Sequence, residues 1–527
     1  MSGRDGLTPM TGLPDGVDRA LRVLAAVALE RRQAYDALDA VTGDGDFGST
    51  FARGAAAVVR ARPDSLRTAG LAFAAAAGGS SGALLGAALV RLDGHGLADD
   101  SDADRVSAAL LDADAAVAEL GGAALGDKTL RDALHPAATA LRDGGVTAAV
   151  AAARSAAYAT AGLTARRGRS AYAGERSVGA VDPGAVAVAD VLEAWVAGEP
   201  PTWEALLDRV GEPAGEDAGS AEDDRVDRAV AGLVASHPSL RRLPGVRAVV
   251  RADAGAGSEG APRVVLVSGG GAGHEPLHAG FVGAGMLDAA CPGAVFTSPS
   301  SAQVLAAAEA VDQGAGVLFV VKAYTGDVLN FGLAAQSLGG TSATVLVADD
   351  VATAVDDGPG RRGTGATVAV EKLAGALAAE GADLGSCRAL GQAVADDARS
   401  YGIAFRGEEM EQGVGIHGEP GRPREPRRHG SALAHALCDP LLAEVDPAAP
   451  LLVLLSGLGG TALLDLQATY ADVVDVLTAA GRTVVRSLVG DLVTSLDQPG
   501  MLLTLVPFDE RRTALWDAPV STPALTW

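Results

Sequence analysis

Residues 413–421, GVGIHGEPG, place a single histidine, His417, in a run of glycine, glutamate and proline. Glycine allows backbone angles that other residues avoid and proline fixes one angle, so the run predicts a rigid, irregular turn around one reactive group. A neutral imidazole is a competent nucleophile toward a carbonyl. Taken alone, the run is equally consistent with a surface turn in which the histidine has no chemical role.

Two other runs place polar side chains directly after a β-rich segment. VVLVSGGGAGHEP leads through a glycine-rich turn to His274, and GVLFVVKAYTGDVLN leads to Lys322, Asp327 and Asn330. The first run fits neither G-x-x-x-x-G-K-[ST] nor G-x-G-x-x-G, so its glycines indicate close backbone approach to something small rather than a standard nucleotide loop. An aspartate just beyond a strand lies at the ligand-binding end of an α/β sheet. A purely loop-forming role remains the alternative for each run.

Three carboxylates lie close together near the N-terminus. In LDAVTGDGDFGST, Asp39, Asp44 and Asp46 are separated by glycines that let the chain fold back sharply. Converging carboxylates repel one another unless a hard cation lies between them, and Mg²⁺ takes oxygen ligands and commonly bridges to phosphates. The spacing does not fit the EF-hand loop. The alternative is a solvated Asp/Gly turn.

Three further segments of this half carry polar groups in glycine-rich surroundings. AGGSSGALLG (residues 77–86) precedes a fresh apolar run, and free N–H groups at such a helix start suit phosphate oxygens, although a plain serine N-cap explains it as well. The other two segments are LGDKTLRDALHP, with Asp127, Lys128 and Thr129, and GRSAYAGERSVGAVDPGA, with Arg169, Arg176 and Asp182.

The chain contains only three lysines, Lys128, Lys322 and Lys372. Arginine supplies nearly all of its positive charge. A lysine kept in such a sequence hints at a compact point charge that a guanidinium cannot mimic. Lys128 and Lys322 fall inside the runs above. Lys372, in EKLAGALAAEG, is expected on a helix surface.

Composition limits the class of protein. The 527 residues suggest about three domains at roughly 100–200 residues each, and 48% hydrophobic with 20% charged residues fits a globular protein with large cores. A formal net charge of −24 argues against nucleic acid as a partner but permits a small anionic ligand. The N-terminus lacks a signal-peptide core, and no apolar run reaches the ~18 residues of a membrane helix, so we expect a cytoplasmic protein without membrane association. Cys291, Cys387 and Cys438 form no CxxC pair, which argues against a disulfide framework or a zinc site.

The pattern of apolar residues divides the chain into two halves. Residues 16–200 show helical spacing throughout, for example in 16–41, 103–124 and 185–198, whereas residues 210–226 are acidic and lack apolar periodicity. Beyond them, β-rich runs such as RVVLVS, GVLFVV and LLVLLS alternate with helical stretches, which indicates α/β architecture. We therefore expect a multidomain chain: an all-α N-terminal domain over 1–205, a linker over 206–226, and an α/β region of two subdomains over 227–527, divided near 400–430.

Four motifs of the first half together resemble the nucleotide-binding L-type domain of dihydroxyacetone kinases. LDAVTGDGDFG, GGSSGALLG, GDKTLRDALHP and GRSAYAGERSVGAVDPGA occur in the family's order over about 35–185. The resemblance implies an all-α barrel of eight helices that binds ATP or ADP through magnesium ions. It implies metal ligands at Asp39, Asp44 and Asp46, phosphate contacts at Ser80, Ser81 and Gly82, and nucleotide contacts at Gly126, Thr129, Arg176 and Asp182. Phe47 departs from the family, whose members usually carry His or Cys there.

The runs around His274, Lys322 and His417 resemble the substrate-binding K-type domain of the same kinases, over about 226–510. The resemblance implies that His417 binds the ketone carbonyl covalently as a hemiaminal and that His274 hydrogen-bonds a substrate hydroxyl. Asp327 matches the candidate base, while Gly271 and Lys322 match further substrate contacts. Anchoring a small, flexible molecule in this way reduces the entropic cost of orienting it. A homodimer through the K-type half is also implied.

The order of the halves is reversed relative to the usual fusion, in which the K-type half comes first. The expected function is an ATP- and Mg²⁺-dependent kinase that phosphorylates a terminal hydroxyl of a small hydroxyketone, foremost dihydroxyacetone. Having both domains on one chain favours free ATP as the donor. A four-carbon ketose such as erythrulose is the alternative substrate, and a non-catalytic ligand-sensing regulator is the alternative class.

Overall fold

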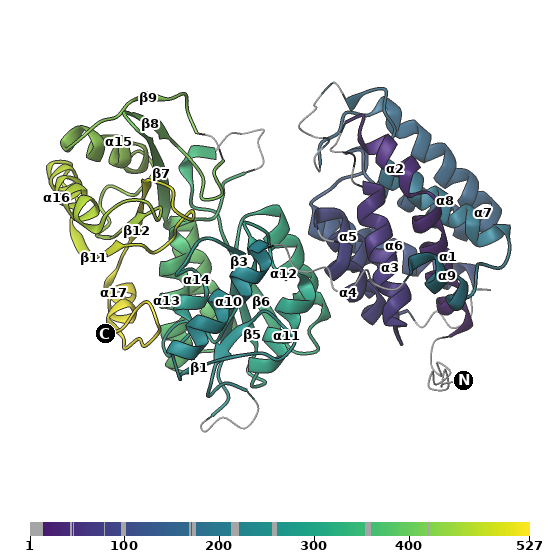
Figure 1. Cartoon of the computed structure of the whole chain (residues 1–527), viewed down its shortest axis with the longest axis horizontal. Helices are drawn as coiled ribbons and strands as arrows, with labels where there is room; N and C mark the ends of the chain where they lie inside the picture. Colours follow the sequence, from purple (N-terminus) through teal and green to yellow (C-terminus); the bar gives the residue numbers. More distant parts are fainter. Residues whose placement is uncertain are drawn as a thin grey trace. The chain divides into compact units, whose positions relative to one another are not determined.

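The computed structural model describes residues 14–42, 45, 47–77, 79–95, 102–167, 170, 175, 177–211, 221–255, 261–353, 360–419 and 421–527. The chain forms two compact units, one made essentially of residues up to 218 and the other of residues from 219 onward (Figure 1).

In its described part, the first unit is built from helices alone, as expected. The helices are α1 (Asp15–Glu30), α2 (Arg32–Asp39), α3 (Phe47–Ala61), α4 (Leu66–Ala77), α5 (Gly79–Asp93), α6 (Ala103–Gly121), α7 (Arg131–Ala159), α8 (Pro183–Ala197) and α9 (Trp203–Val210). The helix expected over 16–41 is two helices, because Arg31 between them has non-helical angles of φ −96° and ψ 3°.

Aromatic rings fill the part of this core that the many alanines leave open. Phe51 packs against Tyr35 and Phe73 with ring centroids 6.0 and 5.9 Å apart. Phe47 lies 6.0 Å from both Tyr35 and Phe51. The residue that departs from the family pattern is therefore a buried core residue at the start of α3.

The second unit contains two six-stranded sheets. The first has the order β1-β2-β4-β3-β5-β6, with β1 (Leu240–Arg242), β2 (Val249–Arg251), β4 (Ala289–Val295), β3 (Val265–Ala272), β5 (Val317–Lys322) and β6 (Ser342–Val347). Strands β4, β3, β5 and β6 run parallel. The second sheet has the order β11-β10-β12-β7-β8-β9, with β11 (Val484–Gly490), β10 (Leu451–Gly457), β12 (Gly500–Pro507), β7 (Arg399–Arg406), β8 (Glu409–Gln412) and β9 (Glu425–Pro426).

Helices cover these sheets and confirm the expected α/β class for this half. They are α10 (Ala221–Ser236), α11 (Ser301–Val311), α12 (Thr325–Ser337), α13 (Ala366–Ala379), α14 (Leu384–Asp397), α15 (Ser431–Leu442), α16 (Leu463–Ala479) and α17 (Glu510–Asp517). Within the described residues, no helix combines the length and apolar character needed to cross a bilayer.

The segment expected as a linker is partly helical. Helix α9 extends to Val210, and its Trp203 Nε1–H donates to Asp18 Oδ1 at 2.6 Å, which fastens it to α1. Helix α10 begins at Ala221. Residues 206–210 and 221–226 are thus part of helices, and residues 212–220 lie outside the described part.

Helix α13 packs against β3 and β5 of the first sheet and against β12 of the second. Because it is enclosed in this way, its Lys372 is fully buried, and Lys372 Nζ donates to the Leu515 carbonyl at 2.7 Å. The expectation that Lys372 lies on a helix surface is wrong. Its neighbour Glu371 is also fully buried.

The close packing of α13 against its neighbours leads to a prediction about stability. A Cβ added at Gly375 would lie 2.6 Å from both Cα and O of Met286, whereas nothing lies within 4 Å of a Cβ added at Gly232, which is exposed on α10. Gly375→Ala should lower the free energy of unfolding by about 1–3 kcal/mol through overpacking. The matched Gly232→Ala should raise it by up to about 1 kcal/mol, because alanine favours the helix. Urea unfolding followed by circular dichroism measures both, and equal midpoints for the two variants would contradict the packing described for α13.

Candidate active site

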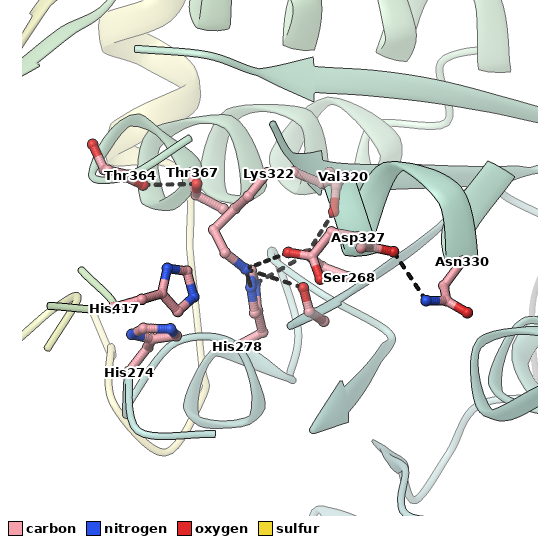
Figure 2. A network of polar contacts seen from close by, with 12 residues as sticks. Ser268, His274, His278, Val320, Lys322, Asp327, Asn330, Thr364, Thr367 and His417 are labelled. Carbon is pink, nitrogen blue, oxygen red and sulfur yellow. Dashed lines mark hydrogen bonds and ion pairs between the residues drawn. The ribbon is translucent and has the colours of Figure 1, made fainter. Parts of the chain in front are cut away.

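The candidate site of the α/β half lies where the parallel strands β3 and β5 end. The two strands are direct neighbours, so the glycine run at the end of β3 and Lys322 at the end of β5 reach the same edge of the sheet. Figure 2 shows the side chains of His274, Lys322 and Asp327 at this edge, together with His417. The runs that the sequence singled out are therefore brought together in space.

The glycines in the last part of β3 allow other groups to approach the backbone closely. A Cβ added at Gly270 would lie only 2.2 Å from Lys322 Nζ, and one added at Gly271 would lie 2.6 Å from the backbone nitrogen of Thr297. An alanine at residue 270 would displace the lysine amine. The run thus makes room for a charged side chain of the protein itself.

Lys322 is fully buried and uses its ammonium group on protein partners. Its Nζ lies 3.2 Å from the Gly269 carbonyl, 2.8 Å from His278 Nε2 and 3.4 Å from Asp327 Oδ2. An ammonium group has three protons to donate, so these three contacts account for all of them. In this geometry Lys322 donates to His278 and forms an ion pair with Asp327.

Asp327 lies in the first turn of α12, where the helix dipole favours negative charge. The side chain is 2% exposed. Oδ2 faces Lys322, while Oδ1 is buried and has no hydrogen-bond partner among the described residues. One oxygen is thus held in place, and the other is available to a ligand hydroxyl.

His274 is fully buried, and its ring orientation is set by one backbone contact. Nδ1 lies 2.8 Å from the Thr494 carbonyl, which can only accept, so Nδ1 carries the proton. Nε2 is then a bare acceptor, and it has no partner among the described residues. Burial first, and then the nearby His417 and Lys322, lower the pKa of His274 well below 6.5, so the ring is neutral.

His417 lies on the loop that follows β8, and Glu419 orients it. The backbone N–H of His417 donates to Glu419 Oε2 at 2.8 Å, and Nδ1 lies 3.2 Å from Oε1. Burial alone would raise the pKa of Glu419, but the hydrogen bond and the charge of His417 outweigh it and lower that pKa to about 2. The ionised carboxylate accepts the Nδ1 proton, which leaves Nε2 of His417 as the free nitrogen.

Three rings surround the imidazole of His417 edge-on. Its centroid lies 4.3 Å from that of Tyr324, 4.6 Å from that of His274 and 5.5 Å from that of Phe296. Figure 2 shows the His274 and His417 rings side by side, next to the Lys322 cluster. The arrangement gathers the buried imidazole of His274, the partly exposed imidazole of His417 and one buried carboxylate oxygen of Asp327.

The carboxylate motif of the helical half is described in part. Asp39 ends α2 and is 9% exposed, and its Oδ2 accepts from the backbone N–H groups of Gly45 at 3.0 Å and Phe47 at 3.4 Å. Asp44 and Asp46 lie outside the described residues. The predicted metal set thus remains a prediction, with Asp39 held by the loop that carries the other two.

The predicted phosphate and nucleotide residues lie at helix starts and turns. Ser80, Ser81 and Gly82 form the first turn of α5. Gly126 has a left-handed φ of +91°, and its N–H and that of Thr129 donate to the two oxygens of Asp132 at 2.6 and 2.8 Å. Arg176 lies outside the described residues.

Asp182 caps α8 by accepting from Ala185 N at 2.7 Å. Burial is the main cause that raises the pKa of Asp182 to about 7, and the carboxylates of Asp132 and Asp39 add to the rise. The hydrogen bond from Ala185 and the charge of Lys128 oppose it. Asp39, Asp132 and Asp182 therefore share one neighbourhood. Among the described residues, however, no three His, Cys, Asp or Glu side chains are grouped so that they could hold a metal ion, so these carboxylates alone do not form a metal site.

The structure gives a contact to Lys128, which the sequence singled out without a role, and adds residues that the sequence did not single out. Lys128 is buried, and its Nζ donates to the carbonyls of Leu163 and Ser177, so it fastens a loop. Behind Lys322 lie Ser268, His278 and Glu371. His278 lies two positions beyond the VVLVSGGGAGHEP run, but nothing in the sequence around Glu371 indicates a link to it.

Comparison with known proteins decides the family. The Dak1 domain matches residues 231–524, which is more than half of the chain, and the DAK2 domain matches residues 41–197. The chain belongs to the dihydroxyacetone kinase family. The predicted membership is confirmed, and so is the reversed order, because the DAK2 match precedes the Dak1 match.

Named relatives include kinases of more than one substrate. The dihydroxyacetone-binding subunit DhaK of the PEP-dependent dihydroxyacetone kinase of Escherichia coli K12 is 40% identical over 351 residues, covering 58% of this chain and 97% of that protein. An L-erythrulose 1-kinase of Mycolicibacterium smegmatis is 38% identical over 331 residues, covering 58% of this chain and 57% of that protein.

Solved structures extend the likeness to both enzymes and regulators. The dihydroxyacetone kinase of C. freundii, solved with AMP-PNP and Mg²⁺, matches with a TM-score of 0.51 and 32% identity over 58% of this chain and 60% of that one. A protein solved in connection with regulation of the dha operon of Lactococcus lactis matches with a TM-score of 0.54 and 30% identity, over 57% of this chain and 95% of that one.

The protonation assigned to His274 can be tested directly. Since its pKa lies well below 6.5, the ring signals of His274 should keep the neutral, Nδ1-protonated form between pH 7.5 and 5.5. Nitrogen-15 NMR of the histidine rings, of which the chain has 8, measures this, and the signal lost in His274→Gln provides the assignment. A His274 signal that titrates with a midpoint near 6.5 would contradict the buried, neutral imidazole.

Proposed function

We propose that the chain is an ATP-dependent kinase that phosphorylates a terminal hydroxyl of a small hydroxyketone, most simply dihydroxyacetone. The observation that carries the proposal is the pair of imidazoles, His274 and His417, whose centroids lie 4.6 Å apart beside an aspartate with one open oxygen. Family membership and the kinases among its relatives support the same conclusion.

His417 captures the ketone. Nε2 attacks the carbonyl carbon, a C–N bond forms, and the π electrons of the carbonyl move to its oxygen. The ring is then positively charged and gives its Nδ1 proton to Glu419, which releases it to solvent, while the former carbonyl oxygen takes one proton from solvent; the result is a neutral hemiaminal with no net gain or loss of protons. Glu419 lies 3.2 Å from Nδ1 and is ionised, so it is placed to accept that proton.

The remaining groups act on the hydroxyls. His274 Nε2 accepts a hydrogen bond from one hydroxyl, and Asp327 Oδ1 takes the proton of the hydroxyl that attacks the γ-phosphate. Both atoms are buried and have no partner among the described residues. Each atom is therefore a buried acceptor that a substrate hydroxyl can use.

The helical half supplies the nucleotide. Asp39, with Asp44 and Asp46, would hold Mg²⁺, which neutralises charge on the transferring phosphate when it is bound. The N–H groups in the first turn of α5, at Ser80, Ser81 and Gly82, would receive phosphate oxygens. The C. freundii kinase solved with AMP-PNP and Mg²⁺ supports this ligand pair. Both domains on one chain favour ATP as the donor.

A four-carbon ketose is the second candidate substrate, and the M. smegmatis L-erythrulose 1-kinase favours it. Hemiaminal formation selects for a carbonyl and not for chain length, so the same residues serve either ketose. The likeness to a protein of dha operon regulation keeps a non-catalytic sensor as an alternative. The sequence has the three aspartates and His417 that catalysis would need, which argues for the enzyme.

The broader expectations are carried here as proposals. The division into 1–205, 206–226 and 227–527, a homodimer through the α/β half and a cytoplasmic location all rest on the sequence and the family resemblance. Light scattering of the purified protein decides the oligomeric state.

The proposed capture of the ketone predicts a selective loss of affinity. With MgATP, the protein should phosphorylate dihydroxyacetone or erythrulose in a coupled ADP-release assay. His417→Ala should lower kcat/KM by about 100-fold or more, because the covalent anchor that orients the substrate is lost. His435→Ala, which removes an exposed histidine on α15, is the control and should leave the rate unchanged. Failure of the wild type to consume ATP with either ketose would contradict the kinase proposal.

The proposed metal site predicts a nucleotide-binding defect that does not depend on the ketose. Asp44→Ala should weaken binding of AMP-PNP in the presence of Mg²⁺ by about tenfold or more, measured by calorimetry, because a carboxylate ligand is lost. Removing Mg²⁺ with EDTA should weaken the wild type to a similar degree. Asp104→Ala, which changes an exposed aspartate in the first turn of α6, is the matched control. Equal affinity of Asp44→Ala and wild type would remove Asp44 from the site.

A further inference from the structure

A chain of buried polar groups lies behind Lys322, and the proposed function does not use it. Ser268 comes from β3, His278 from the loop after β3, and Glu371 from α13. His278 is 5% exposed, and Ser268 and Glu371 are fully buried. Figure 2 shows Ser268, His278 and Asp327 gathered around the Lys322 amine.

The hydrogen bonds of this chain run in a fixed direction. Lys322 can only donate, so His278 Nε2, 2.8 Å away, must accept. Nδ1 of His278 therefore carries the proton and donates to Glu371 Oε1 at 2.7 Å and toward Ser268 Oγ at 2.9 Å. The Ser268 hydroxyl donates in turn to the Val320 carbonyl at 2.7 Å, so it can only accept from His278.

This direction couples Glu371 to Asp327 through two intermediates. Lys322 donates to His278 on one side and faces Asp327 Oδ2 on the other, at the longer distance of 3.4 Å. If Glu371 is ionised, it polarises the His278 ring through the Nδ1–H bond, so Nε2 becomes a stronger acceptor for the Lys322 proton without removing it. Asp327 then has a weaker positive partner. If Glu371 is protonated, the positive charge stays on Lys322.

We propose that Glu371 and His278 are positioning residues that act through Lys322 and set how strongly Asp327 accepts the substrate proton. The inference rests on the proposed function, since it concerns the base of that reaction. A merely structural alternative exists, in which the chain only satisfies the hydrogen bonds of a buried lysine. The positioning role and the structural role differ in whether ionisation of Glu371 changes kcat.

The groups around Glu371 make its ionisation observable. It is faced by His278, Ser268 and Lys322, while His278 is also faced by His274. Burial raises the pKa of Glu371 to about 8 and outweighs the opposing effects of Ser268 and Lys322. Burial first, and then Lys322 and His274, lower the pKa of His278 well below 6.5, so the imidazole does not titrate in the same range. Glu371 Oε2 has no partner among the described residues.

The test is the pH dependence of kcat for dihydroxyacetone between pH 6 and 10. The wild type should show a rise in kcat of about threefold to tenfold with a midpoint near pH 8, because ionised Glu371 makes Asp327 the stronger base. Glu371→Gln keeps the size and the acceptor oxygen but cannot ionise. It should hold kcat at the low-pH level throughout, with KM for the ketose within twofold of the wild type. His278→Gln, which also cannot relay charge, should lose the rise as well.

Lys372→Met is the matched control. Lys372 is the next residue on α13 and is buried, and its pKa is lowered by burial to about 8, but its Nζ donates to the Leu515 carbonyl outside the chain of groups. It should leave the rise intact. A rise that persists in Glu371→Gln, or that disappears in Lys372→Met instead, overturns the proposal.

A second readout separates this inference from the proposed function. Nitrogen-15 NMR of His278 in the protein without substrate should show a ring shift with a midpoint near pH 8 that is absent in Glu371→Gln. If the His278 ring shows this shift but kcat does not change with pH, the groups have only a structural role and the proposal is overturned. If the wild type phosphorylates no ketose, the proposed function fails, and a missing His278 shift would show that the coupling itself is absent.

Discussion

A single buried positive charge constrains most of the candidate active site. Lys322 is fully enclosed, and a charge away from water is tolerated only when partners receive its protons. The three acceptors come from the backbone of β3, from His278 and from the first turn of α12. The parallel pairing of β3 and β5 brings these together, and only a glycine at residue 270 leaves room for the amine.

The two histidines of the site depend on the second sheet in a similar way. His274 follows a strand of the first sheet, yet its Nδ1 proton goes to the carbonyl of Thr494, in the loop after β11. His417 and its partner Glu419 lie in the loop after β8. Each ring needs a fixed acceptor for one nitrogen before the other nitrogen can face a ligand. This requirement explains why both sheets are needed to complete the site.

Local sequence was sufficient where a functional group follows a strand directly. The runs through His274 and through Lys322 and Asp327 could be placed at one sheet edge, because a strand, a turn and a polar residue occur within a few positions. The helical half was equally clear, since its periodicity is long and unbroken. Strands β8 and β9 were not expected, because EMEQ and EP carry charged residues in place of an apolar alternation.

Long-range pairs could not be found in this way. Glu371 lies 93 positions from His278, and a Glu-Lys pair in an alanine-rich helix usually marks a solvated face. Here α13 is enclosed by both sheets, so the same two residues are buried, and each finds its partner in a distant segment. The sequence pattern was misleading because it records only the neighbours of a residue along the chain.

In the proposed mechanism, the two chemical tasks respond differently to pH. Capture of the ketone depends on Glu419, whose pKa of about 2 keeps it ionised at neutral pH. Removal of the hydroxyl proton depends on Asp327, whose partner Lys322 is linked through His278 to Glu371, with its pKa of about 8. The ionisation of Glu419 is therefore constant over the range in which that of Glu371 changes. Because separate carboxylates serve the two tasks, either one can change without loss of the other.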